Sequence, residues 1–210
     1  MQAIDGIFYI VVLIMSIVIH EFSHGYTAYL LGDDTAKQSG RLTLNPIKHL
    51  DLFGSIILPI LLYFSTGGSF LVGWAKPVPY NPNNLKNRKR GELLIAIAGI
   101  LANLALAIVF GLFIRLAIVL GLPLDNPFYN IASIIVIINL VLFLFNIIPI
   151  PPLDGSKILF SLLPYKYKNL EYLLERWGLF LLLFFIIFLW SKVAPFIYLM
   201  FHLITGVALM

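Results

Sequence analysis

The chain of 210 residues is 60% hydrophobic and 11% charged, and its mean hydropathy is +0.97. A soluble domain carries about 25% charged residues and cannot hide so many apolar side chains in one core. The composition therefore excludes a disordered chain, a nucleic-acid-binding module and a small disulfide scaffold. It predicts an all-α polytopic membrane protein that forms one domain over residues 1–210. No cysteine is present, so thiolate metal ligands and a cysteine nucleophile are also excluded.

Long apolar runs separated by charged clusters define the expected spans. The runs cover residues 6–31, 93–122, 131–150, 177–191 and 193–210. About 20 apolar residues cross the hydrocarbon, and tryptophan and basic residues flank the shorter fourth run as interfacial anchors. We therefore expect five spanning helices, the last two separated only by Lys192 and Pro195.

Residues 52–66 form a shorter apolar run, with Gly54 and Pro59 inside it. A run of about 15 residues fits a re-entrant segment better than a full span. If it crossed the membrane instead, the number of spanning helices would be six. The basic loops on either side of this run favour the re-entrant form, because both can then face the cytoplasm.

The charges of the other loops orient the chain in the cell membrane. Loop 122–130 has no lysine or arginine and is expected outside, whereas loop 155–176 is basic and is expected in the cytoplasm. We therefore expect the N-terminus outside and the C-terminus in the cytoplasm.

Residues 69–82, between the first and second full spans, predict a short β element at the membrane surface. Prolines at 77, 79 and 82 prevent a helix, while the aromatic and β-branched residues between them favour extended structure. Proline is tolerated at the edge of a sheet, so we expect an exposed edge strand. A structured loop without a function is the alternative.

The first apolar run contains three ionisable residues in the sequence H-E-F-S-H. Burying such a group in the membrane costs on the order of 2.5–3.5 kcal/mol, so each one is a candidate functional residue. On a helix, His20 and His24 share one face and can bind one zinc ion, with Glu21 beside it as a general base. The alternative is a polar helix face that packs through Ser23 and Tyr26.

Catalytic zinc usually has three protein ligands, so a third residue must be found. His49 lies in a charged loop, and His202 lies in the last apolar run without polar neighbours. Asp154 is the better candidate, because three prolines between residues 149 and 152 stop the preceding helix and Gly155 lets the backbone turn sharply. Alternatively, Asp154 only caps a helix that begins near Ser156.

H-E-F-S-H on an apolar helix, followed downstream by N-x-x-P-x-P-P-L-D-G, resembles the site-2 protease family of intramembrane zinc metalloproteases, peptidase family M50. Further matching stretches lie at Gly40–Pro46, Gly73–Pro79 and Gly99–Asn103, although Ile100 replaces a proline that is frequent in the family. The resemblance covers roughly residues 10 to 165. No stretch is long enough for the PDZ insert of some relatives, so we expect a minimal, core-only member.

The resemblance implies that His20, His24 and Asp154 bind one Zn²⁺ per chain. It also implies that Glu21 is the catalytic base and that Asn146 lies near the substrate. The catalytic core would cover residues 6–165, and residues 176–210 would form the C-terminal helices.

The implied activity is hydrolysis of peptide bonds in or near the transmembrane segments of single-span membrane proteins. The active site would lie toward the cytoplasmic side of the bilayer, and a regulatory partner would fit this family. No nucleic-acid partner is expected. Two other classes stay open: an ion- or proton-translocating protein that uses the same buried charges, and a zinc-binding protein that captures helices without cutting them.

Overall fold

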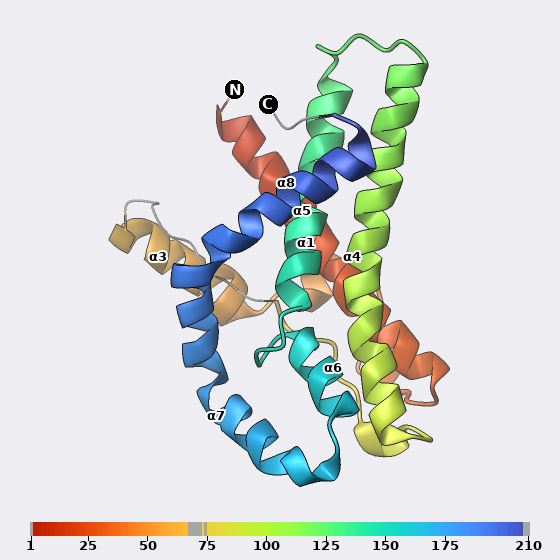
Figure 1. The fold of residues 1–210 in the computed structure, drawn as a ribbon, viewed down its shortest axis with the longest axis vertical. Helices are drawn as coiled ribbons and strands as arrows, with labels where there is room; N and C mark the ends of the chain where they lie inside the picture. The colour runs from red at the N-terminus through yellow and green to blue at the C-terminus, as the bar shows by residue number, and fades with distance from the viewer. Residues whose placement is uncertain (1, 67–72, 74, 208–210) are drawn as a thin grey trace.

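The computed structural model describes residues 2–66, 73 and 75–207, and these residues contain helices and connecting segments but no strand (Figure 1). The α-helices are α1 (Gln2–Leu30), α2 (Thr35–Gln38), α3 (Leu58–Thr66), α4 (Arg88–Val119), α5 (Pro127–Asn146), α6 (Asp154–Leu162), α7 (Lys168–Phe184) and α8 (Trp190–Thr205). Short 3-10 helices are η1 (Pro46–His49), η3 (Pro82–Asn84) and η4 (Tyr165–Tyr167), and π-helices are η2 (Leu52–Ile57) and η5 (Phe185–Leu189).

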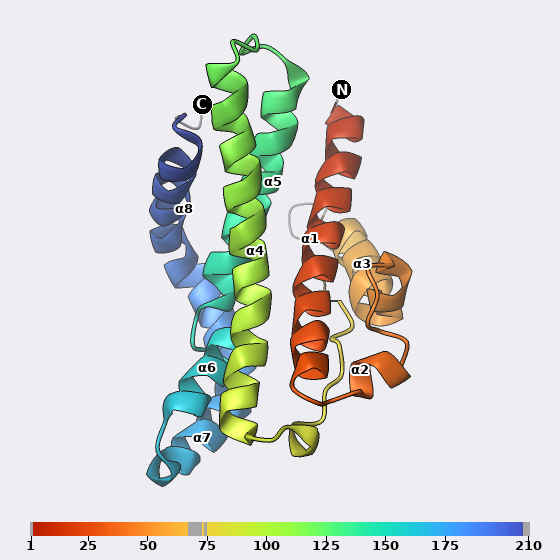
Figure 2. The same cartoon turned by 90° about the vertical axis from the view of Figure 1, so that its right-hand side faces the viewer.

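Four helical stretches of the described chain are long and apolar enough to cross a membrane: Gly6–Leu30, Arg88–Val119, Pro127–Asn146 and Tyr165–Thr205. Helices α1, α4 and α5 lie side by side, and α8 crosses α4 and α5 (Figures 1 and 2). Many large apolar side chains on these helices are exposed, which explains how a chain of this size can be 60% hydrophobic. The sequence prediction of an all-helical integral membrane protein is confirmed at this level.

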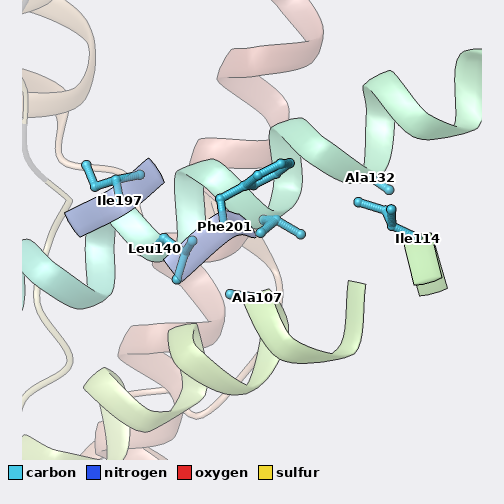
Figure 3. Packing of buried hydrophobic residues seen from close by; sticks show 7 residues of the cluster. Ala107, Ile114, Ala132, Leu140, Ile197 and Phe201 are labelled. Carbon is cyan, nitrogen blue, oxygen red and sulfur yellow. The ribbon is translucent and has the colours of Figure 1, made fainter. Parts of the chain in front are cut away.

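The core between α4, α5 and α8 combines small and large apolar side chains. Its members are Ala107, Ile114, Ala132, Val136, Leu140, Ile197 and Phe201 (Figure 3). Gly111 continues this contact, because a Cβ at Gly111 would overlap the side chain of Ile204 on α8. Helices in lipid associate through such close packing of small residues, since burial from water does not drive them together.

The expected separation of the last two spans at Lys192 and Pro195 is wrong. Residues Tyr165–Thr205 form one helical stretch of 41 residues, and Pro195 lies inside α8. A proline inside a helix removes one hydrogen bond and crowds the preceding turn, and the π-helix η5 lies just before this position. The chain bends between α7 and α8 without leaving the helical conformation (Figure 1), so the described residues hold four long apolar stretches and not five.

The loops divide between the two ends of the bundle according to charge. Helix α2 and the basic segments 81–92 and 155–168 lie toward one end, and the turn at 120–126 lies at the other (Figures 1 and 2). Helix α1 begins and helix α8 ends toward the end that carries the turn at 120–126 (Figures 1 and 2). The expected placement of the N-terminus outside and the C-terminus in the cytoplasm stays a prediction, because the helix positions alone do not orient the chain in a membrane.

The segment 75–81 is not the expected strand, and residues 69–72 and 74 of that prediction lie outside the described residues. A strand requires a ladder to a neighbouring strand. Here the backbone N–H groups find separate partners: Lys76 donates to the carbonyl of His49 (2.9 Å), Val78 to Glu21 Oε2 (2.8 Å) and Asn81 to Asp33 Oδ2 (2.7 Å). The segment is thus fixed to the C-terminal half of α1 and the loop that follows it.

Asp33 is the main attachment point of this segment. Its side chain is fully buried and accepts hydrogen bonds from the backbone and hydroxyl groups of Thr35, the backbone of Asn81 and the amide of Asn84. Burial raises the pKa of Asp33, but the hydrogen bonds from Thr35, Asn81 and Asn84 outweigh burial and hold the pKa below its ordinary value.

We expect Asp33→Ala to destabilise the 75–84 region by about 1.5–3 kcal/mol, the usual range for hydrogen bonds to a charged group. The readout is proteolysis of residues 75–84 and thermal melting in detergent, with the neighbouring exposed Asp34→Ala as control. The pKa of Asp33 is lower in the folded than in the unfolded chain. The contribution of its hydrogen bonds to stability is therefore fully present above about pH 4 and is lost as the pH falls through the lowered pKa. Equal protease sensitivity of the two variants would contradict this role.

Candidate metal centre

A cavity of about 140 Å³ lies where α1, the 75–81 segment, the end of α5 and the start of α6 meet. Its lining residues are His20, Glu21, His24, Pro77, Val78, Tyr80, Asn146, Pro152, Asp154 and Lys157. The predicted site residues, which are spread over more than half of the chain, therefore line a single cavity.

Helix α1 contributes two imidazoles and a carboxylate. His20 and His24 lie one turn apart and are both buried, with their Nε2 atoms 3.0 Å apart. The ligand atoms of His20, Glu21 and His24 lie within 4.8 Å of one another. Glu21 is half-buried, and the N–H of Val78 donates to its Oε2.

Asp154 is the first residue of α6, and its carboxylate points at the two imidazoles. Its Oδ2 lies 3.0 Å from His20 Nε2 and 2.9 Å from His24 Nε2. Gly155 allows this approach, because a Cβ there would overlap the carbonyl groups of Ile147 and Ile148 at the end of α5. The N-cap of α6 is Leu153, without a side-chain capping bond, so Asp154 does not serve as the cap.

Lys157, one turn along α6, binds the other oxygen of Asp154. Its Nζ donates to Oδ1 at 3.1 Å and lies 6.0 Å from the centre of the Tyr80 ring. Lys157 was not among the predicted site residues, and its only signal in the sequence is its spacing of three residues from Asp154.

The three converging atoms fit a zinc ion. The two Nε2 atoms and Oδ2 form a triangle with sides of 2.9–3.0 Å, and one point can lie at zinc distances of about 2.0–2.2 Å from all three. Within the described residues, the buried Oδ2 accepts no well-directed hydrogen bond. A cation bound by all three would satisfy this oxygen.

Helix α4 contacts both imidazole rings. His24 Nδ1 lies 2.7 Å from the carbonyl oxygen of Ile95, and His20 Nδ1 lies 3.2 Å from Asn103 Nδ2. Between them, a Cβ at Gly99 would overlap both imidazole rings. Residues 95, 99 and 103 are four apart and so form one stripe on α4.

The other histidines considered from the sequence do not join this cluster. His49 is buried with Nε2 2.8 Å from the carbonyl oxygen of Thr43, and His202 is exposed on α8. Ser23 donates to the carbonyl of Ile19 on its own helix, so this hydrogen bond does not join α1 to another helix, as the alternative of a structural polar face would require.

Asn146 is the last residue of α5 and lines the cavity. Its Nδ2 donates to the carbonyl oxygen of Leu142 on the same helix at 3.0 Å. The side-chain amide of Asn146 is therefore directed at its own helix in this structure.

Gly99→Ala should weaken zinc binding by about tenfold or more, because the added methyl group displaces both imidazoles. The same change at Gly111, also inside α4, is the matched control: its Cβ meets Ile204 on α8 and leaves the imidazoles in place. Zinc affinity of the purified proteins, measured by competition with a chelator, is the readout. Unchanged affinity in Gly99→Ala would show that the close approach of α4 is not needed.

The model of peptidase family M50 matches residues 8–124 and 116–189 of this chain. The protein named "Putative zinc metalloprotease YwhC" from Bacillus subtilis (strain 168) is 40% identical over 190 residues, which cover 89% of this chain and 80% of that protein. No solved structure matches the chain significantly.

Two further relatives are matched over a smaller share of their own length. The proteins named "Putative zinc metalloprotease Rip2" from Mycolicibacterium smegmatis and Mycobacterium tuberculosis H37Rv are 30% and 32% identical, over 71% and 73% of this chain. The matches cover 56% and 57% of those proteins, slightly more than half of their length. With the family model and the YwhC relative covering most of the chain, and with the His20, Glu21 and His24 cluster on α1, the chain belongs to peptidase family M50, the intramembrane zinc metalloproteases of the site-2 protease type.

Proposed function

We propose that His20, His24 and Asp154 hold the zinc ion of this protease and that Glu21 is its general base. The observation that carries the proposal is the meeting of His20 Nε2, His24 Nε2 and Asp154 Oδ2 within 3.0 Å of one another, beside the Glu21 carboxylate, in one cavity. Three protein ligands leave a fourth zinc position open, as catalytic zinc requires.

The chain's own groups account for the proton transfers. When bound, zinc supplies Lewis acidity that polarises the scissile carbonyl and lowers the pKa of water toward about 7. Glu21 takes a proton from the attacking water as the new C–O bond forms, and returns it to the leaving amine as the C–N bond breaks. The Asn146 amide would leave its bond to the Leu142 carbonyl and donate to the substrate oxygen as negative charge develops.

The 75–81 segment is proposed to receive the unwound substrate. A transmembrane helix hides its carbonyl groups in its own hydrogen bonds, so it must unwind before it can be cut. An extended substrate could add to this segment as a strand, which would supply the ladder that the segment lacks here. The segment already contacts the base, because the N–H of Val78 donates to Glu21 Oε2.

The substrates are membrane proteins as a class, and we propose single-span proteins in the lipid bilayer. The cavity lies toward the basic end of the bundle, since His20 and His24 lie in the C-terminal half of α1. By the positive-inside rule this end faces the cytoplasm. We further propose one domain over residues 1–210, with its catalytic core at 6–165 and residues 52–66 inserted as a re-entrant segment.

Glu21→Gln should lower cleavage of a single-span substrate by about 10²–10⁴-fold and leave zinc content unchanged, because the amide keeps the shape but cannot take the proton. Asp154→Ala is the comparison and should lose zinc. The readouts are metal analysis and product formation with purified protein in detergent or vesicles.

Full activity of Glu21→Gln would overturn the role of Glu21. Wild type that binds both zinc and substrate without forming product would instead support a helix-capturing protein. Ion conduction by zinc-free protein, tolerant of Glu21→Gln, would support a translocating protein.

Val78→Pro should reduce cleavage about tenfold or more at unchanged zinc content, because proline removes the N–H that donates to Glu21 and the donor that a strand could use. Val78→Ala is the control, because it keeps the N–H that donates to Glu21 and removes most of the buried side chain. Comparison of the two variants separates the effect of the hydrogen bond from the effect of side-chain packing. Similar losses of cleavage in both variants would assign the effect to packing.

A further inference from the structure

We propose that Asn103 is a positioning residue that presents its Oδ1 to His20 and thereby fixes the imidazole tautomer that can bind zinc. The inference rests on the proposed zinc site and adds a supporting role for α4. Asn103 is fully buried and lies at the end of the stripe formed by residues 95, 99 and 103.

The partner of His24 shows what such support requires. The Ile95 carbonyl oxygen, 2.7 Å from His24 Nδ1, can only accept a hydrogen bond. The Nδ1 atom therefore carries the proton, and the Nε2 atom of the neutral ring has a free lone pair toward Asp154 Oδ2. A ring nitrogen must be unprotonated to bind a metal, so the backbone of α4 already fixes the correct tautomer of His24.

His20 needs the same arrangement, and Asn103 is the side chain in contact with its Nδ1. As drawn, the NH₂ end of the amide faces His20, with Nδ2 3.2 Å from Nδ1. In that arrangement Nδ1 would accept and the ring proton would lie on Nε2, where zinc must bind. The oxygen and nitrogen ends of an amide have nearly the same shape, so either end can face the ring. With Oδ1 toward the ring, His20 donates from Nδ1 and leaves Nε2 free.

The environment of Asn103 supports this orientation. Its Oδ1 is buried and has no hydrogen-bond partner among the described residues, so the proposed contact gives this oxygen a donor. Gly99 leaves the space in which both rings lie against α4.

Two substitutions with opposite chemistry test the proposal. Asn103→Leu has a similar shape and cannot accept a hydrogen bond, so it should weaken zinc binding by about 10–100-fold. Asn103→Asp is an acceptor that cannot donate when ionised, so it should keep zinc affinity within about threefold of wild type. Affinity is measured by chelator competition on purified full-length protein, together with the melting temperature of the zinc-free form.

Asn139→Leu is the matched control. Asn139 is also fully buried, its Oδ1 is likewise unpartnered among the described residues, and its Nδ2 donates to Ser16 on α1 at 3.0 Å. It does not line the cavity, so its loss should change the melting temperature and leave zinc affinity unchanged. A general effect of losing a buried amide is thereby separated from the specific contact with His20.

Three results would overturn the inference. Wild-type affinity in Asn103→Leu would show that His20 needs no partner, and equal weakening in Asn103→Asp and Asn103→Leu would show that the amide donates. Equal weakening in Asn139→Leu would show a general packing effect. A wild-type protein that binds no zinc would instead overturn the proposed zinc site itself, so the two failures are distinguishable.

Discussion

The candidate site depends on one buried carboxylate oxygen. Asp154 Oδ2 lies within 3.0 Å of two imidazole nitrogens that are more than 100 residues away in sequence. Burying an ionised carboxylate is costly unless a cation or hydrogen bonds compensate it. Lys157 compensates one oxygen, and the other points at the two imidazoles, where we propose that the zinc ion binds. This contact joins the start of α6 to the middle of α1, and the cavity lies where they meet.

Helix α4 is the common neighbour of the elements that build the site. It packs against α1, α5, α6 and α8, using small residues where backbones approach closely. Its stripe of residues 95, 99 and 103 contacts both imidazoles, and Asn139 of α5 adds a polar contact to Ser16 of α1. In lipid, such packing and polar contacts hold helices together, because apolar burial offers little net gain.

The apolar runs predicted α1, α4 and α5 well, since a chain in lipid must satisfy its backbone hydrogen bonds within each helix. The same runs predicted the end of the chain incorrectly. Lys192 and Pro195 resemble a loop in sequence. In the structure the chain passes through a π-helix and bends, but it stays helical. The 75–81 segment was also misjudged: its prolines excluded a helix, but whether it pairs as a strand depends on which partners surround it.

At the site, local spacing was sufficient to select His20, Glu21 and His24, because residues one helical turn apart share a face. The proline-rich break selected Asp154 as a candidate for the same cluster. Little or no local signal in the sequence marks Lys157. The same is true of the contact between His24 and the Ile95 carbonyl, 71 positions apart, and of the contact between His20 and Asn103, 83 positions apart. The sequence alone thus determined which residues have metal-binding chemistry. Only the tertiary structure decided which neighbours contact them, because a backbone carbonyl has no sequence signature and a contact between distant helices depends on how they pack.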